Sequence, residues 1–175
     1  KLTEKEVANG IHPHFDFVNK KMAEATNGFL KVGQGIFGLS RKEYEELELS
    51  EIEKLLVKPY FTTEQFHRYF ASKDFDYWII YTDSSFKNPE SIIPYPSIKN
   101  HLDKFQGVIT SDNKPYGLHR AREERFFIGE KIIVQRKCAG RPVFTYADFE
   151  TYVSATFYLI KTDRVNLKFL TALLN

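Results

Sequence analysis

The residues best suited to contact a charged ligand lie in one stretch of the chain, between Lys114 and Arg141. This stretch contains eight basic and three acidic residues, a local net charge of +5. Arginine is frequent here, and its guanidinium can bind a phosphate or the O6/N7 edge of guanine through two parallel hydrogen bonds. Tyr116 and His119 add rings that could stack on bases or hydrogen-bond to them. The candidate DNA-binding residues are Lys114, Tyr116, His119, Arg120, Arg122, Arg125, Arg136, Lys137 and Arg141.

A solvated surface is the alternative explanation for these charges, because Glu123 and Glu124 lie close enough in sequence to pair with neighbouring arginines. The charge balance is reversed between Arg41 and Lys54, where six glutamates face three basic residues for a local net charge of −3. The formal charge of the whole chain, +2, therefore combines an acidic N-terminal segment with a basic C-terminal half. This division favours DNA as the partner of one face and protein as the partner of the other.

Two further groups could support chemistry, a histidine pair and the single cysteine. His12 and His14 lie two residues apart with Asp16 behind them, a spacing that can hold a cation. No companion His or Cys cluster follows downstream, so we expect a solvated turn and predict no metal site. Cys138 lies beside basic residues, a setting that can activate a thiol. No histidine is near it in sequence, however, and we expect a buried structural cysteine with no catalytic role.

Several catalytic signatures are missing from the sequence. It has no GxxxxGK[ST] phosphate loop and no GxSxG elbow. Adjacent prolines do not occur, which excludes the Asn-Pro-Pro-Tyr motif of amino-methyltransferases, and no Glu is followed two positions later by Lys, as common metal-dependent nucleases require. Gly33-Gln34-Gly35 lacks the third glycine of a dinucleotide loop, so it predicts a turn or a close backbone approach. These absences favour a binding domain without catalysis of its own.

The length and composition predict one folded domain, since 42% of the 175 residues are hydrophobic and 27% are charged. One cysteine cannot form an internal disulfide or a multi-cysteine zinc site. No apolar run approaches the roughly 18–20 residues that span a bilayer, so we expect a cytoplasmic protein without membrane contact. The start at Lys1 and the end at Asn175, inside an apolar helical pattern, suggest a piece of a longer protein.

Helices and strands are predicted in an irregular order. Helices are expected over Phe15 to Ala25, from Thr62 or Thr63 through Gln65, Phe66 and Tyr69, and over Asn166 to Asn175. Two more are expected to begin after the capping-box residues Ser40 and Ser50. A further helix is expected after Pro96, with Ile98, Leu102 and Phe105 on one face. Strands are expected over Phe29 to Val32, Tyr77 to Tyr81 and Tyr152 to Leu159, with a hairpin pairing Lys131–Cys138 and Pro142–Tyr146 across Ala139-Gly140. Without a regular βαβ alternation, the class is α+β with a mixed, mainly antiparallel sheet, flanking helices and a possible helical lead-in over residues 1–30.

Eight short segments follow one another in a familiar order. They are Gly33-Gln34-Gly35-Ile36, Lys58-Pro59-Tyr60-Phe61, Gln65-Phe66-His67-Arg68-Tyr69, Tyr77-Trp78-Ile79-Ile80-Tyr81-Thr82, Ile93-Pro94, Leu102-Asp103-Lys104-Phe105, Gly129-Glu130-Lys131-Ile132-Ile133 and Leu170-Thr171-Ala172-Leu173-Leu174-Asn175. In this order the chain, from about Val32 onward, resembles the TaqI-like C-terminal specificity domain of type II restriction-modification enzymes that combine DNA cleavage and methylation in one chain.

The resemblance implies a target-recognition domain that grips duplex DNA from one side, reads base edges and helps a catalytic domain take an adenine out of the stack. The parent protein would be an adenine-specific DNA methyltransferase, a type II restriction endonuclease or both. It would bind S-adenosylmethionine, with Mg²⁺ as an option, outside this segment. The implied partners are double-stranded DNA and the methyltransferase domain of the same chain. A protein-interaction or assembly domain, built on the acidic segment and exposed aromatic residues, is the alternative function.

Overall fold

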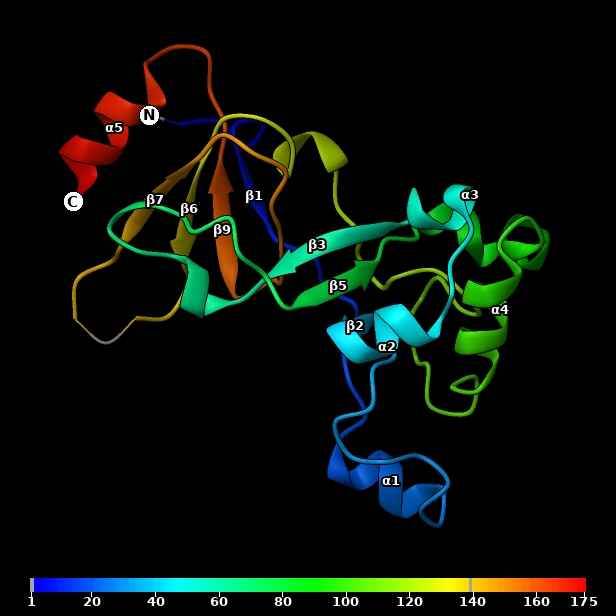
Figure 1. Ribbon diagram of the computed structural model, residues 1–175. Helices are drawn as coiled ribbons and strands as arrows, with labels where there is room; N and C mark the ends of the chain where they lie inside the picture. The colour runs from blue at the N-terminus through cyan, green and yellow to red at the C-terminus, as the bar shows by residue number, and fades with distance from the viewer. Residues whose placement is uncertain (1, 139) are drawn as a thin grey trace. The chain divides into compact units, whose positions relative to one another are not determined.

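Short helices and strands are interspersed along the chain, and the predicted α+β class is confirmed (Figure 1). The computed structural model describes residues 2–138 and 140–175. The strands are β1 (Val7–Asn9), β2 (Gly38–Ser40), β3 (Val57–Phe61), β4 (Tyr69–Phe70), β5 (Tyr77–Ile80), β6 (Lys131–Gln135), β7 (Phe144–Ala147), β8 (Tyr152–Val153) and β9 (Phe157–Ile160). The α-helices are α1 (Lys20–Ala25), α2 (Arg41–Glu46), α3 (Glu51–Lys54), α4 (Pro96–Asp103) and α5 (Leu167–Leu174). Short 3₁₀ helices are η1 (Thr63–Gln65), η2 (Ser84–Lys87), η3 (Pro89–Ile92) and η4 (Glu124–Phe126).

Residue contacts divide the domain into two compact units, each made of separate chain segments. The sheet unit consists of Lys1–Ile11, Pro59–Phe75 and Arg122–Asn175. The helix unit consists of His12–Lys58 and Asp76–Ala121. The sheet unit contains 13 Lys and Arg against 10 Asp and Glu, whereas the helix unit contains 12 against 13. The predicted contrast between basic and acidic parts of the sequence is thus reproduced, more weakly, as a contrast between units.

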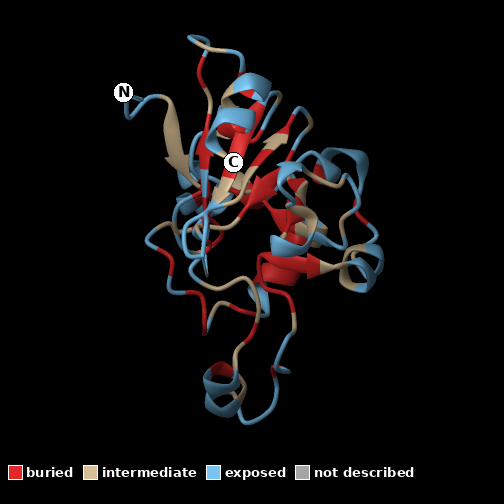
Figure 2. Cartoon of the chain, turned by 90° about the vertical axis from the view of Figure 1, so that its left-hand side faces the viewer, coloured by how far each residue is buried: buried red, intermediate tan, exposed pale blue. Residues whose placement is uncertain are grey.

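The sheet unit is built on five strands in the order β1-β9-β6-β7-β4, antiparallel except where β4 pairs with β7. Helix α5 packs on this sheet through Leu167, which joins Ile132 and Ile160 in a buried cluster. Figure 2 shows the buried positions on the strands and the exposed positions on the outer side of the helices. The predicted hairpin is confirmed, because β6 and β7 are antiparallel neighbours that place Ile133 opposite Thr145. Its predicted turn includes Ala139, which lies outside the described residues.

The strand predicted over Tyr152 to Leu159 is interrupted. Strand β8 pairs in parallel with β3, and β9 joins the five-stranded sheet, with a turn between them. The cause is the segment at Ile11, whose backbone N–H donates to the Val153 carbonyl at 2.8 Å and whose carbonyl accepts from Ala155 at 2.6 Å. A Cβ on Gly10 would lie 2.1 Å from the Ser154 carbonyl oxygen, so only glycine permits this approach.

Both capping boxes predicted in the helix unit are present, at the starts of α2 and α3. The Glu53 side chain, 1% exposed, also accepts hydrogen bonds from the backbone N–H groups of Ser97 and Ile98 and so ties α3 to the start of α4. Burial opposes ionisation of Glu53, but these bonds and those from Ser50 outweigh it and lower its pKa. The predicted apolar face of α4 is confirmed, since Ile98 and Leu102 are fully buried.

Helix α1 is shorter than predicted and begins at Lys20, with Asn19 as its cap. The preceding residues are extended, because Val18 exchanges backbone hydrogen bonds with Gly33 and Gln34. The Gly33-Gln34-Gly35 segment forms the turn and close approach predicted for it: φ is +83° at Gly33, and a Cβ on Gly35 would lie 2.2 Å from the Gly38 carbonyl oxygen.

Two other predicted elements differ from the observed ones. Phe29 to Val32, predicted as extended, consists of bends and a turn. The helix predicted from Thr63 through Tyr69 is reduced to η1, and strand β4 follows it.

Candidate nucleic-acid interface

The nine predicted binding residues fall into both units. Lys114, Tyr116, His119 and Arg120 belong to the helix unit, and Arg122, Arg125, Arg136, Lys137 and Arg141 belong to the sheet unit. The basic stretch of the sequence is therefore divided into two groups with different surroundings.

The connection between β6 and β7 carries the clearest basic surface of the sheet unit. Arg136, Lys137 and Arg141 are all exposed on this loop, called here the basic loop. No Asp or Glu occurs between Lys131 and Ala147, so no acidic residue of the hairpin offsets its three positive charges. The side-chain Nη1 of Arg136 donates to the Ala155 carbonyl at 3.0 Å, and its guanidinium lies 5.2 Å from the ring centre of Tyr158. Arg136 is thus held in place while Lys137 and Arg141 face solvent.

Gln135 is a candidate that sequence reasoning missed. It is exposed at the end of β6, directly before Arg136, and lines a pocket with Ile133, Val143, Thr145, Phe157, Thr63 and Phe66. The side-chain amide of glutamine can form two hydrogen bonds with adenine at once: its NH₂ group donates to N7, and its oxygen accepts from the N6 amino group. Glutamine is therefore a common reader of that base. The observation that points to this role is the exposure of Gln135 at the end of the hairpin strand. The sequence did not reveal it, because the strand was predicted to continue to Cys138 and β6 ends at Gln135.

Arg125 behaves as the solvated-surface alternative predicts. Its Nε donates to the Glu123 carboxylate at 2.7 Å, and its Nη2 donates to the Lys5 carbonyl at 3.1 Å. The guanidinium also lies 4.4 Å from the ring centre of Phe126. Arg122 is exposed at a left-handed φ of +72°, with its Nε 3.4 Å from the Gly10 carbonyl oxygen. Both arginines are engaged by neighbouring chain segments of the same unit.

Lys131, a further basic residue of the stretch, is buried at the start of β6. Its ammonium donates to the carbonyls of Gly129 at 2.8 Å and Phe149 at 2.6 Å. Desolvation, together with the nearby charge of Lys161, lowers the pKa of Lys131 to about 7. This lysine stabilises the fold and offers no surface charge to a ligand.

Tyr116 is unavailable as a stacking group. It is 6% exposed, and its hydroxyl donates to the Asp103 carboxylate at 2.7 Å. Burial and this hydrogen bond raise its pKa. The prediction placed Tyr116 on a surface loop, whereas the segment folds back so that the ring packs beside α4, with the Lys99 ammonium 5.8 Å from the ring centre. Its role is in the core of the helix unit.

His119 and Arg120 meet the histidine pair of the N-terminal segment. The backbone of His12 pairs with that of Arg120 in an antiparallel bridge. The rings of His12, His14 and His119 consequently lie together, with centres 5.2 to 6.0 Å apart. Sequence spacing could not reveal this cluster, because His119 lies more than a hundred residues after His12 and His14. Within the part of the chain that the structure describes, no group of three or more His, Cys, Asp or Glu residues can hold a metal ion.

Cys138 is exposed, so the prediction of a buried structural cysteine was wrong. The prediction extended the strand to Cys138, whereas β6 ends at Gln135 and Cys138 belongs to the basic loop. Its thiol lies 3.9 Å from the Gly140 carbonyl oxygen. None of the helices in the described part of the chain has the length and apolar character to cross a membrane.

An α+β domain with an exposed basic hairpin loop has the features of a recognition domain. The chain belongs to the family of TaqI-like C-terminal specificity domains, which it matches over residues 12–175. The resemblance inferred from the order of short segments is confirmed, and it begins some twenty residues earlier than predicted.

Among solved structures, the chain is similar to the type IIL restriction-modification enzyme MmeI in complex with DNA. The TM-score is 0.58 at 11% identity, over 91% of this chain and 19% of that one. At this identity the likeness shows a shared fold, and the chain spans about a fifth of the length of that enzyme. No curated protein sequence matches the chain.

Proposed function

We propose that the chain binds double-stranded DNA in a sequence-specific manner, as the target-recognition domain of a restriction-modification enzyme. Membership of the specificity-domain family and the likeness in fold to MmeI, whose structure was solved with DNA, support this function. The observation that carries it within the chain is the basic loop, where three cations project from a hairpin that contains no acidic residue.

The geometry of the loop supports a role in base reading. A two-stranded ribbon fits the major groove of B-DNA, where each base pair presents a distinct pattern of donors and acceptors. Arg136 is braced by Ala155 and Tyr158, so its guanidinium is suited to a fixed contact with a guanine edge. Lys137 and Arg141 are suited to phosphate contacts, which set the position of a domain on the duplex. Gln135 would read an adenine beside them.

The parent protein is, in this proposal, an adenine-specific DNA methyltransferase, a type II restriction endonuclease or both. The missing phosphate, methyltransferase and nuclease motifs support the view that catalysis resides outside these 175 residues. S-adenosylmethionine, and Mg²⁺ in a parent that cleaves DNA, would be bound by other parts of that protein. The domain would act on DNA together with the methyltransferase domain of the same chain, and in the cytoplasm.

A protein interface is the second candidate function, and one surface of the helix unit favours it. Helix α3 and the residue after it expose Ile52 and Leu55, the latter by 68%, beside an acidic segment. Exposed apolar side chains within an acidic surface suit contact with another protein domain better than contact with DNA.

The proposal is tested by measuring the affinity of the 175-residue chain for a library of labelled duplexes at several salt concentrations. We expect weak binding to every duplex, a steep loss of affinity between about 50 and 200 mM salt as counterions are released, and tighter binding to a subset that shares a sequence. Light scattering on the same samples reports the oligomeric state. A tight oligomer that retains no duplex even at low salt would favour the protein-interface alternative.

A further inference from the structure

Three of the five histidines of the chain gather at one place on the helix unit. The ring centres of His12 and His119 are 5.2 Å apart, those of His14 and His119 are 5.5 Å apart, and those of His12 and His14 are 6.0 Å apart. All three pairs meet edge to face. His12 and His14 are exposed, and His119 is partly exposed. These residues are called here the histidine cluster.

The backbone fixes the cluster and adds a permanent positive charge to it. His12 and Arg120 exchange backbone hydrogen bonds of 3.0 and 2.9 Å. Residues directly opposite in such an antiparallel pair project their side chains to the same face, so the exposed Arg120 side chain shares the face of His12. The bridge therefore brings an arginine that cannot lose its charge beside three imidazoles that can gain one.

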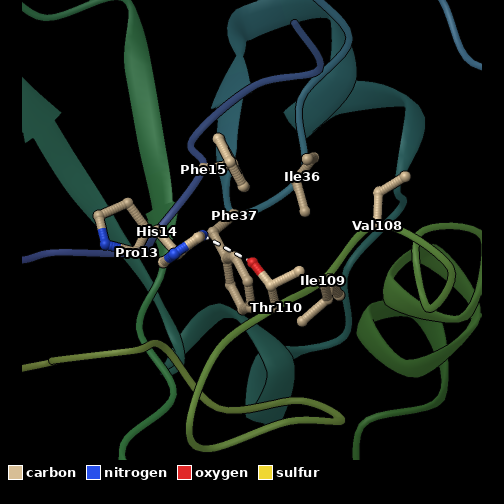
Figure 3. Close-up of a pocket in the computed structure, with 8 residues that line it drawn as sticks. All are labelled: Pro13, His14, Phe15, Ile36, Phe37, Val108, Ile109 and Thr110. Atoms are coloured by element: carbon tan, nitrogen blue, oxygen red, sulfur yellow. Dashed lines mark hydrogen bonds between the residues drawn. The ribbon is translucent and has the colours of Figure 1, made fainter. Parts of the chain in front are cut away.

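Hydrogen bonds orient two of the three rings. The Nδ1 atom of His14 lies 2.7 Å from the Thr110 hydroxyl oxygen, and a dashed line marks this hydrogen bond in Figure 3. The backbone φ of His14 is +83°, a value that non-glycine residues seldom adopt. The Nδ1 atom of His119 accepts from the Asp112 backbone N–H at 3.4 Å. Nε2 is the other nitrogen of each ring, and in a protonated ring it carries a hydrogen that it can donate to a ligand. A protonated His119 would also donate from Nδ1, and the Asp112 carboxylate, 3.4 Å from that nitrogen, can accept this hydrogen bond.

Charged groups of both signs lie on the segments that form the cluster. The segments that carry the three histidines also carry Asp16, Asp112, Lys114 and Arg120. The Asp112 carboxylate lies 3.4 Å from Nδ1 of the His119 ring. Protonating all three rings at such short spacing is opposed by their mutual repulsion. A phosphate bound among them would remove that opposition and accept hydrogen bonds from each.

We propose that the histidine cluster and Arg120 bind a phosphate of the DNA backbone, and that the imidazoles take up a proton when they do so. The proposal rests on the DNA-binding function proposed above and assigns it a second contact, on the helix unit. DNA affinity should then increase as the pH falls through the range in which imidazole titrates, near pH 6.5. Because imidazoles near pH 6.5 are already partly protonated in the free chain, we expect an average uptake of about half a proton, which changes a binding constant about threefold per pH unit.

The test compares affinity for one labelled duplex of random sequence at about pH 7.5 and about pH 6.0, because phosphate contacts do not depend on base sequence. The wild-type chain should bind about fivefold tighter at the lower pH. The variant His12→Gln/His14→Gln/His119→Gln should show less than about a twofold difference. His67→Gln is the matched control, since His67 is exposed but belongs to the sheet unit, and it should retain the wild-type response.

Two measurements keep the test decisive. Thermal melting shows whether the triple variant folds, and the single variant His14→Gln replaces it if it does not. Proton–nitrogen NMR of the imidazoles in the wild-type chain needs no variant: addition of duplex should shift the signals of His12, His14 and His119 and leave that of the buried His101 unchanged. Inorganic phosphate at matched ionic strength should shift the same signals at higher concentration, because it offers the same chemistry without the neighbouring contacts.

Each outcome discriminates. Duplex binding with the same pH response in the triple variant as in the wild type would overturn the phosphate site and leave the proposed function intact. A chain that binds no duplex at either pH would overturn both. Imidazole signals that shift with inorganic phosphate but not with duplex would assign the cluster to a free anion and overturn its role in DNA binding.

Discussion

The two ends of strand β6 carry cations that the fold treats in opposite ways. At the first end, Lys131 is fully buried and its ammonium donates to two backbone carbonyls. At the other end, the strand runs into the basic loop, whose Arg136, Lys137 and Arg141 are exposed. Lys131, which stabilises the sheet unit, thus lies only five positions before Arg136, which is exposed and accessible to a ligand.

This difference shows that the net charge of a sequence segment overestimates how many of its basic residues are accessible to a ligand. Of the basic residues in the stretch that first suggested DNA binding, Lys131 is buried and Arg125 is engaged by Glu123 and the Lys5 carbonyl. The cations that remain exposed in the sheet unit on a segment without acidic residues are those of the basic loop. Burial distinguishes Lys131 from the exposed cations of the basic loop, and a carboxylate partner distinguishes Arg125 from Arg136, since both of these arginines donate to a backbone carbonyl.

The largest effect is expected from removing the basic loop's charges. The variant Arg136→Ala/Lys137→Ala/Arg141→Ala should bind DNA about 100-fold more weakly, because it loses one base contact and two phosphate contacts. The slope of log affinity against log salt should become shallower by about two. Fluorescence anisotropy across a salt series measures both quantities, and urea unfolding should show a stability within about 0.5 kcal/mol of the wild type.

A charge-matched variant serves as the control for that experiment. Arg41→Ala/Lys42→Ala/Lys54→Ala removes three cations from the acidic segment, each of which has a carboxylate partner. It should weaken DNA binding by less than about threefold. Equal losses in the two triple variants would mean that affinity follows overall charge and that the basic loop has no special role.

The next effect concerns Lys131 and appears in stability. Because its pKa in the folded chain is about 7 and lies well below that of an unfolded lysine, the unfolded state binds more protons above neutral pH. Wild-type stability should therefore gain from Lys131 as the pH rises from about 7 to about 9. Lys131→Met lacks this gain and leaves two carbonyls without their donor, so it should be less stable by about 2 kcal/mol at the higher pH.

Chemical unfolding at the two pH values measures this difference. Lys168→Met is the matched control, because Lys168 is exposed on α5 in the same unit and should change stability by less than about 0.5 kcal/mol at either pH. A deficit of Lys131→Met that shrinks as the pH rises would contradict the assignment of a buried, easily deprotonated lysine.

Much of the fold could be predicted because its signals are local. The capping boxes at Ser40 and Ser50, the apolar face of α4 and the pairing of β6 with β7 each depend on residues close together in sequence. The interruption between β8 and β9 could not be predicted in this way, since Ile11 causes it from more than a hundred residues away.

The candidate site was predictable to a smaller degree. The sequence placed Arg136, Lys137 and Arg141 on one hairpin, and the structure shows them there. The sequence also predicted Tyr116 on a surface, because the residues next to it in sequence give no sign of its hydrogen bond to Asp103. The histidine cluster was invisible for the same reason, because the bridge between His12 and Arg120 is a tertiary contact. Burial and long-range pairing decide which residues of a correct type are accessible to a ligand.

A smaller stability effect is expected at Arg164, an exposed cation that does have a partner. Its Nε and Nη2 atoms donate to the two carboxylate oxygens of Glu6, each at 2.7 Å, and Thr162 and Thr3 donate as well. Led by the bond from Arg164, these contacts hold the pKa of Glu6 well below its usual range. The carboxylate therefore contributes stability above the unfolded pKa of Glu, near 4.3, and loses it in more acidic solution.

Arg164→Ala should consequently lower the urea midpoint at neutral pH, and the difference from the wild type should narrow below about pH 4. DNA affinity should change by less than about twofold, because Arg164 is committed to Glu6. A large loss of affinity without a change in the urea midpoint would move Arg164 to the group of ligand-facing cations.

The smallest effect is expected at Arg125, where the two groups of cations are hardest to tell apart. Arg125 is exposed, as the basic loop is, yet its guanidinium is engaged by Glu123, the Lys5 carbonyl and the Phe126 ring. A cation that is already paired with a carboxylate adds little to the positive electrostatic potential that attracts a DNA phosphate. Arg125→Ala should therefore leave DNA affinity within about twofold of the wild type. Arg136 is also an arginine of the sheet unit, and Arg136→Ala should bind DNA about tenfold more weakly in the same anisotropy assay. This variant should also lose sequence preference at one base pair of the recognition site. Similar losses in the two single variants would show that exposure alone, and not the partners of a cation, decides which arginines of this domain contact DNA.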